Sequence, residues 1–237
     1  MDKKQKELIK TYYRKRNIAS ETNDLYEFEN YEVNDFIIKN KLIPYDKINT
    51  TDISKFIANN PDLINYFKNR LGKLSPNGIS LILFKQPQLI DYFKDRLSEL
   101  SSYNVSVILS NQPQLIDYFK NRLDKLSPND IILILSDKPE LGEYFKDRLN
   151  NKDKEHGYEE FRYFEIKELL EAKPELAKYF DKNKFFKELD DDFIFELLYK
   201  HPQVIGYFKD RLGELDKNYI PSLLNKHPQL KKYFNNG

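Results

Sequence analysis

Cysteine is absent from the 237 residues, and glycine (seven) and histidine (three) are scarce. Without cysteine there can be no disulfide scaffold, no thiolate metal site and no cysteine nucleophile, and a reducing compartment is compatible. Long apolar runs are also missing, and the charged stretch that begins MDKKQK lacks the apolar core of a secretory signal. We therefore expect a cytoplasmic (intracellular) protein with no membrane contact.

Motifs that carry catalysis are lacking too. His156, His201 and His227 do not have the spacings by which a helix holds a metal, and the chain has no glycine-rich phosphate loop. The carboxylates of Asp190–Asp192 stand at an expected helix start, where capping of N–H groups is the favoured interpretation over a metal cluster. The sequence therefore predicts a non-enzymatic protein with no cofactor and no metal site.

An excess of charge of one sign is missing as well. Lys and Arg number 39 against 38 Asp and Glu, which gives a formal net charge of +1. A general nucleic-acid or membrane binder usually carries a clear basic excess. The overall charge therefore supports neither class.

What the chain does contain is an internal repeat. Seven segments of the form Pro-x-apolar-x-x-Tyr-Phe follow one another at spacings of 26, 26, 26, 35, 28 and 26 residues. Four copies nearly coincide: LINYFKNRL, LIDYFKDRL, LIDYFKNRL and LGEYFKDRL. Such a period is typical of architectures in which stacked neighbours bury a shared core. The segments begin at Pro61, Pro87, Pro113, Pro139, Pro174, Pro202 and Pro228.

Each repeat is interpreted as two helices. The first is expected over about residues 127–136 in one repeat, where Ser127 is a good N-cap. Apolar residues eight, five and four positions before each Pro, such as Ile131, Ile134 and Leu135, form one helical face. The second helix starts at the Pro, and its apolar residues two, three, six and ten positions later fall on one stripe at 3.6 residues per turn. The capping position also holds Asn49, Ser75, Ser101, Asp190 and Asp216, with Arg162 as the exception.

The sequence thus predicts an all-α fold, a right-handed α-solenoid of about seven helix-pair repeats with a 26-residue period and an N-terminal helical cap. The expected divisions are residues 1–48, a charged segment with a degenerate capping unit at 32–42, and residues 49–237, the α-solenoid repeats. An exposed insertion is expected near residues 150–160.

Charge is unevenly distributed before the first repeat. Residues 1–17 carry seven basic and two acidic residues, whereas residues 21–35 carry six acidic and no basic ones. The basic segment could fold against its acidic neighbour or could act as an arm that touches an anionic partner. We favour the first interpretation, because the acidic neighbour can neutralise the arm at short range.

Two columns of residues are candidates for binding. A Tyr lies five positions after every Pro, and in five repeats an Arg follows four residues later. Stacked repeats could turn these columns into a track for single-stranded nucleic acid. Alternatively, Tyr packs at the edge of the core and Arg pairs with an acid of the adjacent repeat, which we favour because nearby acids nearly cancel the basic charge. The candidate residues are Tyr66, Tyr92, Tyr118, Tyr144 and Tyr207 (the tyrosine column) and Arg70, Arg96, Arg122, Arg148 and Arg211 (the arginine column); the acids are Asp91, Asp95, Asp117, Glu143 and Asp147.

The residue before each Pro varies, from Asn60 through Gln86 to His227. A code of one ligand element per repeat is conceivable. A weakly constrained turn position is the simpler interpretation, and we favour it.

The repeat resembles the broad class of HEAT-like α-solenoids. Its cap, Ile-x-x-Ile-Leu and Pro-x-Leu rhythm, as in LSPNDIILILSDKPEL, is also similar to the mitochondrial transcription termination factor repeat over residues 49–234. The first resemblance implies an α-solenoid. The second implies nucleic-acid binding through a basic concave face.

Since both signs of charge are interspersed, the repeats suit a polar protein interface better than a polyanion. We expect a protein-binding scaffold or adaptor. The alternatives are a nucleic-acid-binding solenoid that uses the two columns and the basic arm, and a structural subunit of a larger assembly. The oligomeric state is left open.

Overall fold

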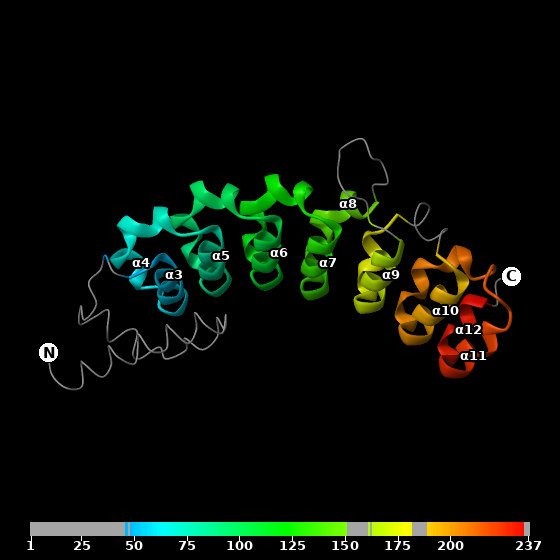
Figure 1. The fold of residues 1–237 in the computed structure, drawn as a ribbon. Coiled ribbons are helices and arrows are strands. Elements are labelled where there is room, and N and C mark those ends of the chain that lie inside the picture. Colours follow the sequence, from blue (N-terminus) through cyan, green and yellow to red (C-terminus); the bar gives the residue numbers. More distant parts are fainter. Residues whose placement is uncertain (1–45, 47, 151–160, 162, 182–188, 235–237) are drawn as a thin grey trace, which may run out of the picture. The chain divides into compact units, whose positions relative to one another are not determined.

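The computed structural model describes residues 46, 48–150, 161, 163–181 and 189–234. This part of the chain is all-helical, as predicted (Figure 1). It belongs to two compact units, Met1–Asn104 and Val105–Gly237, and each is described by itself. The predicted basic arm, acidic segment and capping unit lie outside the described residues, as does the predicted insertion beyond Asn150.

The first compact unit alternates α-helices with short 3₁₀ helices. Its last α-helix, α6, begins here and continues into the second compact unit. The helices are α3 (Thr50–Asn59), α4 (Leu63–Tyr66), η2 (Lys68–Lys73), α5 (Pro76–Lys85), η3 (Pro87–Tyr92), η4 (Lys94–Glu99) and α6 (Ser102–Asn111).

The second compact unit continues the alternation. Each α-helix of about ten residues is followed by a segment that starts at a Pro of the repeat. The helices are η5 (Pro113–Lys125), α7 (Pro128–Asp137), η6 (Pro139–Phe145), α8 (Lys146–Asn150), α9 (Tyr163–Ala172), η8 (Pro174–Tyr179), α10 (Asp191–Lys200), η9 (Pro202–Tyr207), η10 (Lys209–Arg211), α11 (Tyr219–Lys226), η11 (Pro228–Leu230) and α12 (Lys231–Phe234).

The predicted capping residues explain where the first helix of a repeat begins. Each accepts a hydrogen bond from the N–H three residues later, which satisfies one donor that has no partner within the helix. At Ser127 the cap is reciprocal, because the Asp130 side chain also accepts from the Ser127 N–H. The prediction is wrong at Asp216, which accepts from the N–H of Asn218, so α11 starts later with Asn218 as its N-cap. The confirmed caps are Asn49, Ser75, Ser101, Ser127 and Asp190.

The second helix of the repeat differs from the prediction, since most of it is 3₁₀ rather than α. In one repeat the segment is interrupted at the central Phe93, which has φ −121° and ψ 6°, whereas η5 runs through its central Phe without a break. Hydrogen bonds there span three residues, with the Phe93 N–H bonded to Ile90 O and the Arg96 N–H to Phe93 O. Because three residues make one 3₁₀ turn, residues three and six after the Pro still point the same way. The apolar pattern is therefore satisfied by the tighter helix.

The core lies between the two helices of each repeat and between neighbouring repeats. The apolar residues of the first helix are fully buried, as at Ile79, Ile82 and Leu83 in α5. The second segment adds Leu89, Ile90 and the central Phe93, which are also buried. Equivalent positions repeat this burial along both compact units, except that Ile220, Leu224 and Phe234 in the last described repeat are half-buried. The sequence pattern therefore identified most of the core correctly.

Candidate functional site

The tyrosine column lies on the segments that follow the prolines, and its rings are displayed to solvent. In the first compact unit the exposed fractions are 37% for Tyr66 and 42% for Tyr92. In the second compact unit they are 42% for Tyr118 and 43% for Tyr144, whereas Tyr207 is half-buried. The column therefore offers aromatic surface in each unit.

Hydrogen bonds tether two of these rings to the preceding repeat. The Tyr92 hydroxyl donates to Asn65 Oδ1 at 3.3 Å, and the Tyr144 hydroxyl donates to Asp117 Oδ1 at 3.4 Å. In both cases the acceptor lies 27 residues earlier in the chain. The hydroxyls thus fix the ring positions while the rings remain accessible.

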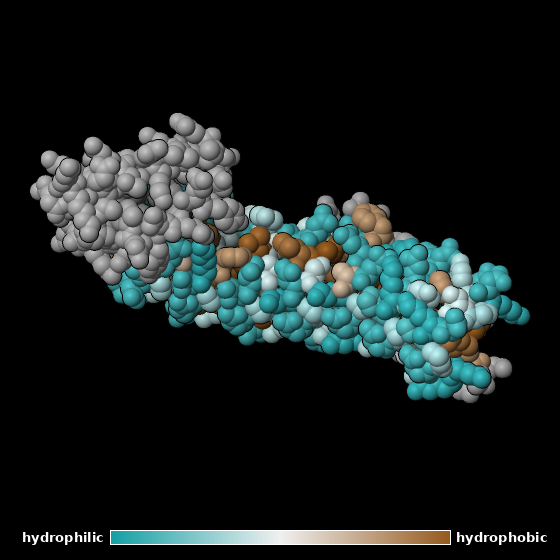
Figure 2. Space-filling model, turned by 90° about the horizontal axis from the view of Figure 1, so that it is seen from below, coloured by the Kyte–Doolittle hydropathy of each residue, from teal (hydrophilic) through white to brown (hydrophobic). Residues whose placement is uncertain are grey.

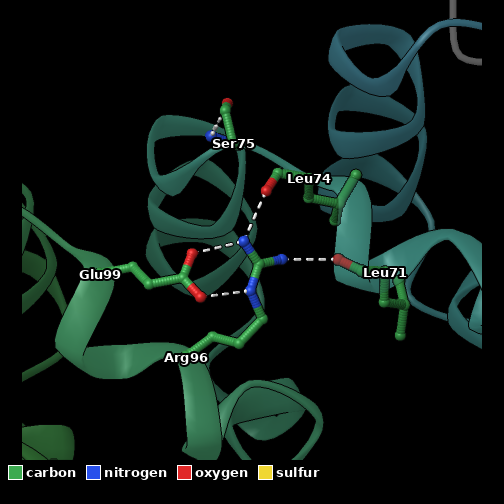
Figure 3. A network of polar contacts seen from close by, with 6 residues as sticks. Leu71, Leu74, Ser75, Arg96 and Glu99 are labelled. Atoms are coloured by element: carbon green, nitrogen blue, oxygen red, sulfur yellow. Dashed lines mark hydrogen bonds and ion pairs between the residues drawn. The ribbon is translucent and has the colours of Figure 1, made fainter.

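Arg96 shows what the arginine column does (Figure 3). Its Nη1 donates to the carbonyl oxygen of Leu71 at 2.7 Å, and its Nη2 donates to that of Leu74 at 2.8 Å. Both carbonyls lie at the end of the second segment of the preceding repeat. That of Leu71 also accepts from the Leu74 N–H at 3.2 Å, whereas Leu74 follows the last helical residue, where acceptors commonly lack partners within the helix. Nε and Nη2 also bind the two carboxylate oxygens of Glu99, at 2.9 and 2.5 Å. Arg96 therefore caps the preceding repeat.

The same contact recurs in the second compact unit. Arg148 donates to the carbonyl oxygens of Asp124 and Leu126 at 2.6 and 3.0 Å. Arg211 donates to that of Leu189 at 3.1 Å. The acceptors Leu74, Leu126 and Leu189 each precede their arginine by 22 residues. These three leucines form a column of apolar residues that the sequence shows, but the sequence does not indicate that their carbonyl groups are acceptors.

The remaining two arginines of the column, Arg70 and Arg122, are half-buried. Burial lowers the pKa of Arg122, whereas the hydrogen bond with Glu99 raises the pKa of Arg96. Arg96 in turn lowers the pKa of Glu99. Arg70 and Arg122 are thus partly shielded from water, as Arg96 is.

Arg211 also pairs with an acid 20 residues earlier, Asp191 Oδ1, at 3.0 Å, but the acids named from the sequence are not the partners of Arg96. Arg96 binds Glu99, three residues later, and neither Asp91 nor Asp95. Instead, ion pairs between lysine and acid three residues apart lie along the exposed side of the same segments, at 2.7, 2.8 and 3.7 Å. Lys120 lowers the pKa of Asp117, which raises the pKa of Lys120 in return. The pairs are Asp91–Lys94, Asp117–Lys120 and Glu143–Lys146.

In two repeats the residue before the Pro has a defined contact with the preceding repeat, which the interpretation as a weakly constrained turn did not anticipate at these positions. Gln86 Nε2 donates to the carbonyl oxygen of Ala58 at 2.8 Å. His227 Nε2 lies 2.9 Å from the carbonyl oxygen of Tyr199, also 28 residues earlier. Ala58 and Tyr199 both lie in the last turn of the preceding first helix, α3 and α10. Gln and His therefore cap one helix of the preceding repeat, as Arg caps the other.

Neighbouring first helices also meet at a recurring pair of positions. The residue on the earlier helix lies seven positions before its Pro, and the residue on the later helix lies nine positions before the next Pro. Between α3 and α5 this pair is Ser54 and Gly78, and a Cβ atom on Gly78 would stand 2.2 Å from Ser54 Oγ. In the second compact unit the pair is Ser106 and Asp130, whose side chains are hydrogen-bonded at 3.1 Å. Only glycine permits the close approach at Ser54.

Later repeats use larger side chains at the same pair. Lys167 Nζ lies 4.6 Å from the centre of the Phe193 ring, a cation–π contact. Phe195 of α10 stacks on Tyr219 of α11 with ring centres 4.4 Å apart and planes at 15°. The Tyr219 hydroxyl also donates to the Asp192 carboxylate, which raises the pKa of Tyr219 to about 12. Sequence reasoning missed this cluster because the pairing depends on which residues of two helices face each other.

The described residues bring together few groups that could carry other chemistry. Within these ranges no group of three or more His, Asp or Glu side chains could hold a metal ion. None of the helices in the described ranges is long and apolar enough to cross a membrane.

A comparison of the chain with protein-family models, curated proteins and solved structures finds no match.

Proposed function

We propose that the chain is a non-enzymatic scaffold or adaptor, built as a right-handed α-solenoid of about seven helix-pair repeats, that binds a protein partner. The solenoid form is supported by contacts that recur at fixed separations: Tyr at 27 residues, Gln or His at 28 and Arg at 22. Each recurrence joins a repeat to the one before it. Such nearest-neighbour contacts are typical of linear repeat arrays.

The observation that carries the proposed function is the state of the tyrosine column. Tyr118 and Tyr144 expose 42 and 43% of their surface, and the Tyr144 hydroxyl is held by Asp117. A tethered tyrosine loses little conformational entropy on binding, and tyrosine is enriched in the energetically dominant part of protein interfaces. The ion pairs around the column supply polar groups of both signs, as the rim of such an interface requires.

The alternative, a nucleic-acid track, receives less support from the same contacts. Arg96, Arg148 and Arg211 donate to backbone carbonyls, and Arg96 is also matched by Glu99. A phosphate would have to displace these partners and leave the carbonyls of the preceding repeat without donors. Three of the exposed lysines beside the column, Lys94, Lys120 and Lys146, are paired with acids, which offsets their positive charge next to the rings.

The test compares capture of proteins from an extract of the source organism by three baits: the wild type, a Tyr118→Ser/Tyr144→Ser variant and a Tyr103→Ser control. Tyr103 is 66% exposed and lies outside the column, so its substitution removes a comparable ring elsewhere. Circular dichroism checks that each bait is folded. Proteins held by the wild type and the control but lost from the double variant support the proposal.

Labelled single- and double-stranded DNA and RNA oligomers are titrated in parallel at low and physiological salt. Binding that weakens steeply with salt and needs the column would establish the nucleic-acid alternative and overturn the proposal. Capture that is unchanged in the Tyr118→Ser/Tyr144→Ser variant would also overturn it, because the column would then have no part in binding.

A further inference from the structure

The first helices have a side that turns away from the core. At 3.6 residues per turn, the buried residues eight, five and four positions before the Pro share one side, so residues ten, six and three positions before it lie opposite. In the second compact unit this opposite side carries an apolar residue on three successive first helices, α6, α7 and α9. Val107 and Leu133 are half-buried, and Phe164 is 53% exposed. We call these three residues the apolar face.

The three helices lie side by side. The Ser106 hydroxyl of α6 donates to Asp130 of α7, and α7 packs against α9. Figure 2 shows the protein from the side of the first helices, and apolar surface is visible there among hydrophilic residues near the middle of the picture, where Figure 1 places α6 and α7. On α10 the positions equivalent to Phe164 and Leu133 hold Asp192 and Glu196, both exposed. The apolar face is therefore a local feature and not a property of every repeat.

Exposed charge around the apolar face is acidic. Among the described side chains of α7 and α9, the exposed ones include three acids and no base: Asp137, Glu168 and Glu171. Asp137 is the last residue of α7, and Glu171 lies in the last turn of α9. A carboxylate is unfavourable at these two positions, because the helix dipole has its negative end there. The sequence thus places acids beside the apolar face at a local cost.

Basic groups offset these acids only in part. Lys167 of α9 is half-buried and binds Asp190 at 3.1 Å. Lys138 and Lys173, which follow the ends of α7 and α9, are half-buried as well. Within the described ranges none of the three acids forms an ion pair, in contrast to the paired charges beside the tyrosine column. The apolar face is therefore bordered by a negative surface.

We propose that the apolar face and its three acids bind a basic amphipathic helix of a partner protein. Apolar side chains of the partner cover Val107, Leu133 and Phe164, and flanking Lys or Arg side chains pair with the acids. A cation beside Asp137 and Glu171 also relieves their unfavourable position at the ends of their helices.

A helix fits this face better than an extended segment. An extended segment gains affinity by pairing its backbone with the edge of a sheet, and the described part of the chain has no strand. A helix satisfies its own backbone. Seven of its residues rise about 10.5 Å, close to the roughly 8–10 Å between packed helices, so apolar residues at i and i+7 reach neighbouring first helices.

Two other occupants are less favoured. The chain's own basic segment, residues 1–17, is followed by the acidic residues 21–35, which can neutralise it at short range. A second copy that presented the same face would bring like charges together, which disfavours a symmetric dimer.

The inference shares with the proposed function only the premise that the partner is a protein. The apolar face lies on the first helices and the tyrosine column on the segments that follow the prolines, so each is tested by its own variants. Unchanged capture of proteins by the Tyr118→Ser/Tyr144→Ser variant would overturn the proposed function and leave this inference standing.

The experiment uses two labelled synthetic helices of about 18 residues, roughly five turns. They share leucines at i, i+3, i+4 and i+7, and one has lysine and the other glutamate at the remaining positions. Fluorescence anisotropy measures their dissociation constants for the full chain. The basic peptide is expected to bind at least about tenfold more tightly than the acidic one.

Glu168→Lys/Glu171→Lys is expected to weaken binding of the basic peptide by about tenfold or more. Glu140→Lys/Glu175→Lys is the matched control, because it reverses the same number of charges at exposed positions of η6 and η8, and it should weaken binding less. Phe164→Ser should also weaken binding, whereas Tyr118→Ser/Tyr144→Ser should leave it unchanged. Circular dichroism checks that each variant is folded.

Equal affinity for both peptides, equal effects of the two charge reversals, or full binding by Phe164→Ser would overturn the inference. Loss of binding in the Tyr118→Ser/Tyr144→Ser variant would overturn it too, because the peptide would then bind at the column. Binding that appears only after residues 1–17 are removed would assign the face to the chain's own basic segment instead. Self-association in sedimentation velocity that Phe164→Ser abolished would assign it to a second copy.

Discussion

Replacing Arg96 with alanine tests whether the arginine column holds neighbouring repeats together. The substitution removes two hydrogen bonds to the carbonyl oxygens of Leu71 and Leu74 and the bidentate pair with Glu99. The Arg96 side chain is 20% exposed, so these bonds are partly shielded from water. We expect a clear loss of stability with little change in helix content.

The magnitude follows from the two carbonyl contacts. A hydrogen bond that involves a charged group contributes about 1.5–3 kcal/mol, and water can partly replace the lost donor at the edge of the structure. The lower half of the range therefore applies, and the expected loss is about 2–4 kcal/mol. That is a large fraction of the roughly 5–15 kcal/mol by which a typical domain is stable.

Urea unfolding followed by circular dichroism and tyrosine fluorescence measures the loss. Lys94→Ala is the matched control, because it removes the same charge from the same segment, where Lys94 forms an exposed pair with Asp91. The control should lie within about 0.5 kcal/mol of the wild type. If Arg96→Ala were no more destabilising than Lys94→Ala, the carbonyl contacts would not hold the repeats together, and the case against a nucleic-acid track would weaken.

Three further outcomes are expected. Gly78→Ala should destabilise the chain by about 1–3 kcal/mol through the clash with Ser54 Oγ, and adding Ser54→Gly should restore most of the loss in the same urea titration. The Arg96–Glu99 pair depresses the pKa of Glu99 below its ordinary 4.5. The ion pair therefore contributes its full stabilisation of the fold above pH 4.5 and loses it as pH falls through the depressed pKa. The urea midpoint of the wild type should consequently fall more below pH 4.5 than that of Glu99→Gln. The raised pKa of Tyr219, about 12, means that its hydrogen bond to Asp192 stabilises the fold below pH 10 and is lost as pH rises through 12. Tyrosinate absorbance should show a late-titrating component that is lost in Tyr219→Phe.

The first helices could be predicted from sequence because their signals are local. Ser127 caps α7 through an N–H only three residues away, and the apolar spacing of Ile131, Ile134 and Leu135 needs no knowledge of neighbours. The nature of the second segment could not be predicted this way, because burial at two, three, six and ten residues after the Pro satisfies either helix type. The segment is 3₁₀ both where it is interrupted, at Phe93, and where it is continuous, in η5, and the sequence carries no separate signal for the tighter helix.

The contacts between repeats were harder to predict because they depend on register in three dimensions. The period made Arg96, Arg148 and Arg211 visible as a column, and acids were the obvious partners for a guanidinium. Nothing local indicated that the true acceptors are carbonyls at the end of the preceding repeat. The contacts of Gln86 and His227 were missed for the same reason, since these two residues differ in chemistry but can both donate to a carbonyl.

These caps give the repeats a direction. Gln86 and Arg96 belong to one repeat, and their acceptors, the carbonyl oxygens of Ala58 and Leu74, both belong to the repeat before it. Both helices of the earlier repeat therefore receive donors from the later one, and a change that displaced the later repeat would leave these carbonyls without the donors.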